Sequence, residues 1–128
     1  MPNKRKELPR GAGILLPVSS LPSPYGIGAL GKAAFAFIDF LKEAGQKYWQ
    51  VLPVGPTSFG DSPYQSFSAF AGNPYFIDLD TLREEGLLEQ AEIDAFDWGD
   101  APDDVNYAKI YQSRFQVLRS AFQRSRHR

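Results

Sequence analysis

The side chains best suited to chemistry in this sequence are concentrated in one segment, between residues 49 and 79. The segment begins as a β-forming run and then turns repeatedly, because glycines and prolines follow at positions 55, 56, 60 and 63. The turning part combines flat rings with hydroxyl, amide and carboxylate groups on Phe59, Asp61, Ser62, Tyr64, Gln65, Ser66, Phe67 and Ser68. Rings stack on apolar faces and polar groups hydrogen-bond to hydroxyl edges, so the segment predicts a sugar-binding corner.

Acid–base chemistry is restricted in this segment, because Asp61 is the one carboxylate in the aromatic loop. Retaining glycoside cleavage uses two carboxyl groups about 5 Å apart, a pair that the loop alone does not contain. The acidic pairs at 84–85 and 103–104 lie in turn-rich contexts typical of solvated surface. Asp78 and Asp80 flank a predicted strand end, where turn and capping roles are favoured. Asp61 either hydrogen-bonds to the loop backbone or contacts a sugar.

Two strands and a helix are predicted ahead of this loop. Residues 13–16 form an apolar run ended by Pro17, and a helix begins near Gly31 and ends at Gly45, where a left-handed residue is favoured. Residues 48–52 read as the next strand, with Trp49 in the core. A strand, a helix and a strand in close succession predict a right-handed βαβ unit with parallel strands.

Beyond the loop the pattern is mostly helical. Residues 75–79 read as a short strand, Asp80 as an N-cap, and residues 81–85 and 90–96 as short helical turns. Asn106 is expected to cap a longer final helix. One apolar face of that helix is predicted from Tyr107, Ile110, Tyr111, Phe115, Leu118 and Phe122, with Lys109, Arg114 and Arg119 elsewhere.

Composition sets broad limits on function. The chain has 128 residues, 43% hydrophobic and 23% charged, with a formal net charge of −1 and no cysteine. The sequence shows no secretory h-region and no apolar run of about 18 to 20 residues, so a cytoplasmic protein with neither a membrane nor a nucleic-acid partner is predicted. The basic residues at 123–128 lack interleaved aromatics, and His127 has no catalytic partner in a structured setting.

Residues 26–31 match the G-x-G-x-x-G pattern and precede the first predicted helix. A dinucleotide site is disfavoured, because about ten loop residues separate the pattern from its strand and residues 47–50 include no acid to bind a ribose. A glycine-rich turn into the helix is the preferred interpretation. No phosphate-binding or metal-ligand pattern is found elsewhere in the sequence.

Two long motifs resemble one enzyme family. GILLPVSSLPSPYGIGALG at 13–31 and YWQVLPVGPTSFGDSPYQSFSAFAGNPYFIDL at 48–79 are similar to the N-terminal part of amylomaltase, the 4-α-glucanotransferase or disproportionating enzyme of glycoside hydrolase family 77. The likeness extends from residue 8 to about 122, more loosely over 106–122. It implies a cofactor-free TIM barrel that cuts an α-1,4-glucan, holds the donor part on an aspartate and passes it to the 4-hydroxyl of another glucan. Its substrates are maltooligosaccharides and starch or glycogen fragments.

The resemblance also implies roles for single residues. Tyr64 corresponds to the aromatic platform beside the glucose unit whose bond is cut, and Ser62 to a hydroxyl contact. Phe59 occupies a position that is often tyrosine in relatives and contacts glucan more remotely. The remaining implied contacts are Asp61, Gln65 and Asn73. Relatives commonly carry His and Thr where this chain has Leu16 and Val18.

Length then decides the predicted fold class. A complete (β/α)₈ barrel needs about 250 residues, so residues 1–128 are predicted to be an α/β domain that forms only the first βα units of an incomplete TIM barrel. The family's catalytic carboxylates lie downstream of these residues, and the chain alone is predicted to be inactive. The alternatives are a stand-alone carbohydrate-binding module and a small structural α/β domain. Exposed apolar faces and unpaired sheet edges would favour the incomplete barrel.

Overall fold

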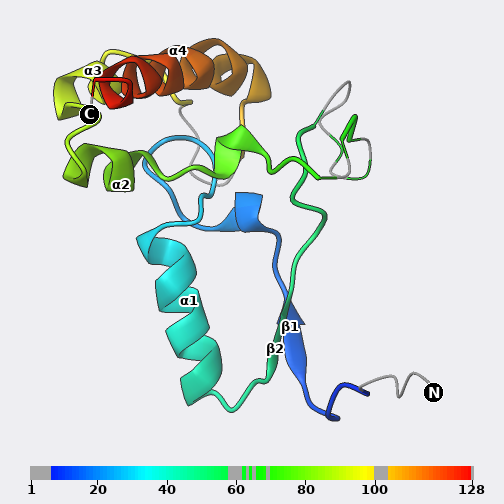
Figure 1. Cartoon of the computed structure of the whole chain (residues 1–128). Helices are drawn as coiled ribbons and strands as arrows, with labels where there is room; N and C mark the ends of the chain where they lie inside the picture. The colour runs from blue at the N-terminus through cyan, green and yellow to red at the C-terminus, as the bar shows by residue number, and fades with distance from the viewer. Residues whose placement is uncertain are drawn as a thin grey trace, which may run out of the picture.

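The computed structural model of the chain describes residues 7–57, 62, 64, 66–68, 70–99 and 104–127. The elements, in chain order, are β1 (Gly13–Leu15), the 3₁₀ helix η1 (Val18–Ser20), α1 (Lys32–Glu43), β2 (Tyr48–Gln50), the 3₁₀ helix η3 (Pro74–Phe76), α2 (Leu79–Glu84), α3 (Gln90–Asp94) and α4 (Tyr107–Ser125). Figure 1 shows β1, β2 and α1 at one end of the molecule and α2, α3 and α4 gathered at the other.

The β1–α1–β2 unit confirms the predicted order and the parallel pairing. Gly13 lies opposite Tyr48 in the parallel register of β1 and β2. A Cβ atom on Gly13 would lie 2.6 Å from the Tyr48 carbonyl oxygen, so glycine permits this close approach. Helix α1 ends as predicted, with Gly45 at φ +71°. Both strands are shorter than predicted, although Leu16 N–H still donates to the Gln50 carbonyl at 3.0 Å.

The predicted strand at 75–79 is wrong, because this segment begins as η3 and continues into α2. The backbone N–H groups are taken locally: Tyr75 N–H donates to Asn73 Oδ1 at 2.9 Å and Phe76 N–H to the Asn73 carbonyl at 3.0 Å. The Phe76 carbonyl accepts a hydrogen bond from Leu30 N–H at 2.9 Å. Backbone groups satisfied in this way are not available to a strand ladder.

The cap of α2 also differs from the prediction. Asp78, and not Asp80, is the N-cap residue, and its Oδ2 accepts from Thr81 N–H at 3.0 Å and from Thr81 Oγ1 at 2.6 Å. Asp80 lies in the first turn, where its Oδ1 accepts a hydrogen bond from the Tyr25 hydroxyl at 2.5 Å. The capping role favoured for this pair is therefore confirmed for Asp78, and the prediction that Asp80 is the N-cap is wrong.

Among the residues that the structure describes, two hydrophobic clusters make the core. The larger one joins α2, α3 and α4 to the loop before α1, and its members include Ile27, Leu79, Ile93, Trp98 and Ile110. The smaller one lies beside α1 and is made by Val18, Leu21 and Ala34, with Phe37 and Trp49 packed against it. Phe76 packs against both clusters. The position of η3 therefore links the two ends of the molecule.

The predicted apolar face of α4 is correct only in part: Ile110 is buried, and Tyr107 and Leu118 pack against the larger cluster, but three aromatic residues of that face are exposed. Tyr111, Phe115 and Phe122 are 65%, 40% and 62% exposed. Besides Ile110, the buried positions of α4 are Ser113, Arg114, Val117 and Ala121, which were not part of the predicted face. Both stripes fit a helical period, so spacing could not choose between them. Arg114 was expected away from the core and is instead 1% exposed. The predicted Asn106 cap is confirmed by its side chain, which accepts from Lys109 N–H at 3.2 Å.

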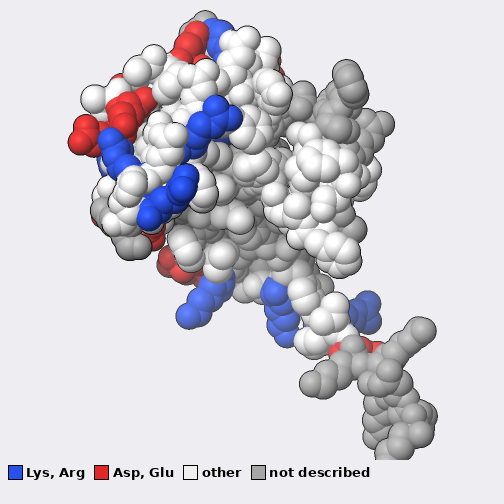
Figure 2. All heavy atoms as spheres, turned by 45° about the horizontal axis from the view of Figure 1, so that its top comes forward, with Lys and Arg blue, Asp and Glu red and all other residues white. Residues whose placement is uncertain are grey.

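The surface carries mixed charge. On the face shown in Figure 2, acidic and basic side chains lie side by side over the helical part of the molecule. One ion pair joins α1 to α2, between Lys32 Nζ and Glu84 Oε1 at 3.3 Å. In the part of the chain that the structure describes, no helix is both long and apolar enough to cross a membrane.

Candidate functional site

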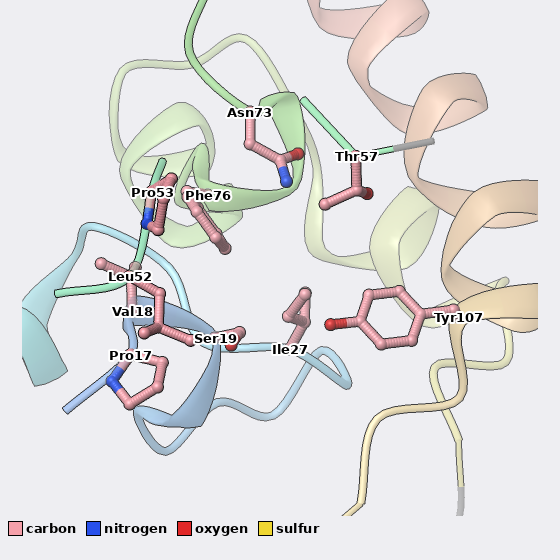
Figure 3. Close-up of a pocket in the computed structure, with 10 residues that line it drawn as sticks. All are labelled: Pro17, Val18, Ser19, Ile27, Leu52, Pro53, Thr57, Asn73, Phe76 and Tyr107. Atoms are coloured by element: carbon pink, nitrogen blue, oxygen red, sulfur yellow. The ribbon is translucent and has the colours of Figure 1, made fainter. Parts of the chain in front are cut away.

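A pocket lies where β1 and β2 end, and the segments that follow these strands form much of its lining. Pro17, Val18 and Ser19 follow β1, and Leu52, Pro53 and Thr57 follow β2. The rest of the lining comes from Ile27, Asn73, Phe76 and Tyr107. Figure 3 shows Tyr107 reaching in from α4 on the side opposite Pro17 and Leu52. The carboxyl ends of parallel strands are where α/β folds place ligands.

The pocket is small and carries no acid. Its volume is about 30 Å³, which holds one or two waters and is too small for a sugar ring. Ser19, Thr57 and Tyr107 carry hydroxyl groups and Asn73 carries an amide, and the described lining residues include no Asp or Glu. This set of groups can hydrogen-bond to a hydroxyl substituent of a ligand that lies over the opening, but it supplies no carboxylate for proton transfer.

The wall that follows β1 is fixed by neighbouring elements. The Trp49 indole N–H donates to the Leu16 carbonyl at 2.8 Å, and the Trp49 ring meets Phe37 edge-on with centroids 5.0 Å apart. Gly28 N–H donates to the Ser19 carbonyl at 3.0 Å, and a Cβ on Gly28 would lie 2.1 Å from the Val18 oxygen. Core packing of Trp49 is thus confirmed, and Gly28 permits the close approach that places Val18 and Ser19.

Asn73 is held firmly on the opposite wall. Its side chain is 7% exposed, and its Oδ1 accepts from Tyr75 N–H at 2.9 Å. Its own N–H donates to the Val54 carbonyl at 2.8 Å, which ties the end of the aromatic loop to the segment after β2. Asn73 therefore shapes the backbone and lines the pocket at the same time.

The aromatic loop presents rings to solvent. Tyr64, Phe67 and Phe70 are 72%, 77% and 100% exposed. Serine hydroxyls form local turns beneath them: Ser66 Oγ donates to the Ser68 carbonyl at 2.8 Å, and Ser68 Oγ accepts from Ala71 N–H at 3.2 Å. A run of exposed rings on serine-stabilised turns suits stacking on a ligand with apolar faces.

The six site residues predicted from the sequence are placed as follows. Asn73 lines the pocket. Ser62 and Tyr64 lie in the aromatic loop and are not among the lining residues, and Ser62 Oγ accepts from Tyr64 N–H at 3.4 Å. Phe59, Asp61 and Gln65 lie outside the described residues. The sugar contacts assigned to all six stay predictions.

Sequence reasoning missed several pocket residues. Ser19 and Thr57 could have been found, because each follows closely after a predicted parallel strand, where functional groups gather. Ile27 and Tyr107 carried no such signal. Tyr107 was assigned to the apolar face of the last helix, and only the folded arrangement brings it to the pocket.

Comparison with known proteins identifies the family. The family model described as 4-alpha-glucanotransferase, of glycoside hydrolase family 77, matches residues 16–128. This chain belongs to that family. The resemblance predicted from the two long motifs is therefore confirmed, and the glucanotransferase match includes both the pocket and the aromatic loop.

Similar glucanotransferases come from several bacteria. The 4-alpha-glucanotransferase of Streptococcus pneumoniae serotype 4 is 55% identical over 115 residues, covering 90% of this chain and 23% of the relative. That of Thermus thermophilus is 55% identical over 116 residues, covering 91% of this chain and 22% of the relative. A solved amylomaltase from Streptococcus agalactiae in complex with acarbose superposes with a TM-score of 0.86 at 47% identity, covering 90% of this chain and 23% of that one. The chain thus spans about a quarter of the length of these relatives.

The glycine pattern at 26–31 has a structural role in this member of the glucanotransferase family. Gly26 adopts φ +81°, and Gly31 is the N-cap residue of α1. A Cβ on Gly31 would lie 2.4 Å from the Asp78 side chain. The glycines therefore turn the chain into α1 beneath α2, in agreement with the preferred interpretation of the sequence.

Proposed function

We propose that this sequence forms the opening βα units of a 4-α-glucanotransferase barrel and supplies a sugar-binding surface at the carboxyl ends of its first two strands. The proposal depends on one observation: the pocket lies at the carboxyl ends of the parallel strands β1 and β2. The family match over residues 16–128 includes all of its lining residues. The exposed rings of Tyr64, Phe67 and Phe70 on the loop between β2 and η3 support it.

The proposed reaction moves an α-1,4-glucan segment to the 4-hydroxyl of an acceptor glucan or glucose by a retaining double displacement. Such a reaction needs a carboxylate nucleophile and a carboxyl acid/base about 5 Å apart. The described residues that line the pocket include no carboxylate, so the chain itself binds and orients sugar. A ring such as Tyr64 packs on a pyranose face, excludes water from it and fixes its orientation, while Ser62 and Asn73 contact hydroxyls. The isolated chain is expected to transfer nothing.

The proposed partners are α-1,4-glucans, including maltooligosaccharides and fragments of starch or glycogen. The solved Streptococcus agalactiae relative is in complex with acarbose, which makes acarbose a suitable probe for this chain. A cytoplasmic location stays a prediction, because the Arabidopsis thaliana and Solanum tuberosum relatives are named as chloroplastic/amyloplastic enzymes.

A stand-alone carbohydrate-binding module is the weaker alternative. Helix α1 leaves Phe35, Ile38 and Phe40 exposed at 68%, 48% and 54%. An independent module of this size would bury such side chains in its own core, whereas an opening barrel unit packs them against later units. These exposed side chains favour the barrel.

The binding proposal is tested by titrating ¹⁵N-labelled chain with acarbose and with maltoheptaose, and by following amide shifts. Wild-type chain is expected to show shifts around residues 62–73, and Tyr64→Ala to weaken binding about tenfold through lost ring burial. Phe35→Ala is the matched control, since Phe35 is 68% and Tyr64 72% exposed. Shifts spread evenly over the chain, or equal loss in both variants, would contradict a site at the loop. Disproportionation of maltotriose by the purified chain would contradict its inactivity.

A further inference from the structure

Arg114 is a buried cation whose bonds go to one backbone segment. Its side chain enters the core from α4 and is 1% exposed. Its Nη2 donates to the Tyr75 carbonyl at 2.8 Å and also to the Ile77 carbonyl. Its Cζ lies 5.8 Å from the centre of the Trp98 ring, close enough for a cation–π interaction.

These bonds complete the hydrogen bonding of η3 and of the residue after it. The carbonyls of Tyr75 and Ile77 are taken by Arg114, and the carbonyl between them, on Phe76, accepts from Leu30 N–H. In a sheet, a neighbouring strand would supply such donors. Here the Arg114 side chain from α4 donates to two of these three carbonyls. Arg114 therefore does for this segment what a strand neighbour does for a β-strand.

The segment that Arg114 holds forms part of the pocket wall. Phe76 lines the pocket and packs against both hydrophobic clusters. Asn73, which also lines the pocket, caps the same 3₁₀ helix. A movement of η3 would displace both side chains together and would shift the end of the aromatic loop.

Burying the charge of Arg114 costs desolvation free energy, which an apolar side chain of similar volume would not cost. Burial lowers the pKa of the Arg114 guanidinium to about 10, and the charges of Asp78 and Tyr25 act in the opposite direction. Among the described residues, Nε and Nη1 of Arg114 have no hydrogen-bond acceptor. An apolar side chain would fill the volume without burying a charge, but it would remove the two hydrogen bonds that Arg114 donates to the carbonyls of Tyr75 and Ile77. The two hydrogen bonds are thus the specific contribution of arginine.

We propose that Arg114 is a positioning residue for the sugar-binding site: through the Tyr75 and Ile77 carbonyls it fixes η3, and thereby the pocket side chains of Asn73 and Phe76. The inference rests on the proposed function for its link to sugar. The positioning itself is measurable without a ligand.

The test compares Arg114→Lys and Arg114→Met with Arg119→Met in the ¹⁵N-labelled chain. Lysine keeps the charge and much of the stem but has a shorter reach, and Arg119 is an exposed arginine on the same helix. Amide shifts and hydrogen exchange are read at the N–H groups within residues 73–77, where Pro74 has none, and, as a reference, in α1. Acarbose titration follows for each variant that remains folded.

The expected result is local. Arg114→Lys changes the amide shifts of residues 73–77 and speeds their exchange, leaves α1 unchanged, and weakens acarbose binding about fivefold, as the loss of one hydrogen bond would. Arg119→Met changes none of these. Unaltered shifts at 73–77 in both Arg114 variants would overturn the proposal, and so would global unfolding of both, which would assign Arg114 to fold stability. If wild-type chain binds no sugar while the 73–77 shifts respond as expected, the proposed function fails and the positioning of the pocket wall stands.

Discussion

Arg124 on α4 and Glu92 on α3 form a two-pronged ion pair, in which Nη1 donates to Oε2 at 2.5 Å and Nη2 to Oε1 at 2.7 Å. Glu92 Oε2 also accepts from Glu89 N–H at 2.9 Å, within the capping box of α3. Arg124 Nη1 donates in addition to the Leu87 carbonyl at 3.1 Å. One carboxylate thus begins a five-residue helix and attaches it to the last helix of the chain.

This pair predicts an acid-sensitive contribution to stability. The hydrogen bond from Arg124, followed by that from Glu89 N–H, lowers the pKa of Glu92 below its ordinary 4.5. A depressed pKa in the folded state adds stability above the unfolded value, and that stability is lost as pH falls through the folded value. Glu92→Gln should therefore lower the melting temperature at pH 7, with the difference from wild type shrinking from about pH 5 downwards.

Melting curves from pH 7 to acid pH check this expectation. Asp39→Asn, which removes an exposed carboxylate on α1, is the control and should stay parallel to wild type. A Glu92→Gln deficit that is constant with pH would show that the charge on Glu92 contributes nothing.

Alanine substitutions at three glycines distinguish the cost of a steric clash from the cost of backbone strain. Gly26 combines φ +81° with a would-be Cβ 2.0 Å from the Trp98 carbonyl oxygen, Gly45 has φ +71° in open space, and Gly72 has neither constraint. Alanine should lower the free energy of unfolding by about 3–5 kcal/mol at Gly26 and by about 1–2 kcal/mol at Gly45. At Gly72 alanine should leave it unchanged or raise it by up to about 1 kcal/mol. Urea unfolding measures all three. Equal losses at Gly26 and Gly45 would refute the tight contact between Gly26 and Trp98.

Tyr25 predicts a loss of stability in alkali. Burial first, and then the hydrogen bond to Asp80, raises the pKa of the Tyr25 hydroxyl above its ordinary 10.0. A raised folded-state pKa means that the associated stability is complete below the unfolded value and is lost as pH rises through the folded value. Tyr25→Phe removes the hydrogen bond to Asp80 and should cost about 1 kcal/mol at pH 7. The cost should diminish above about pH 10, because the variant has no hydroxyl to ionise at this position. Tyr111→Phe, at a residue 65% exposed, should have no effect at pH 7.

The fold could be predicted from sequence where the signal was local. Pro17 ends the first strand run and Gly45 ends α1, so the β1–α1–β2 unit followed from neighbouring residues alone. The segment at 75–79 looked equally strand-like. Its conformation depends on the Asn73 cap and on donors from Leu30 and Arg114, which lie far away in sequence and carry no spacing signal.

The candidate site was also predictable from the sequence only where the signal was local. A loop rich in rings and hydroxyls was visible in the sequence, and so was the position of Asn73 at its end. Tyr107 was not, because its place in the pocket depends on how α4 crosses the molecule. Arg114 was assigned to the polar side of α4 because composition rules put charged residues outside. The hydrogen bonds that Arg114 donates to the carbonyls of Tyr75 and Ile77 override that rule.

Asn73 allows the shape of the site to be separated from its chemistry. Its Oδ1 accepts from Tyr75 N–H, and its side chain lines the pocket. Asn73→Asp keeps an acceptor for Tyr75 N–H and exchanges the amide NH₂ for a carboxylate oxygen, whereas Asn73→Ala removes the cap. Asn73→Ala should lose about 1 kcal/mol of stability, and Asn73→Asp much less.

Acarbose titration of the two Asn73 variants then assigns the contact. If the amide NH₂ donates to a sugar hydroxyl, Asn73→Asp weakens binding about as much as Asn73→Ala does, although its stability stays near that of wild type. If Asn73→Asp instead keeps both the acarbose affinity and the stability of wild type, Asn73 acts only by shaping the backbone. Amide shifts of residues 73–77 distinguish the cases directly, because an intact cap keeps the Tyr75 N–H signal in place.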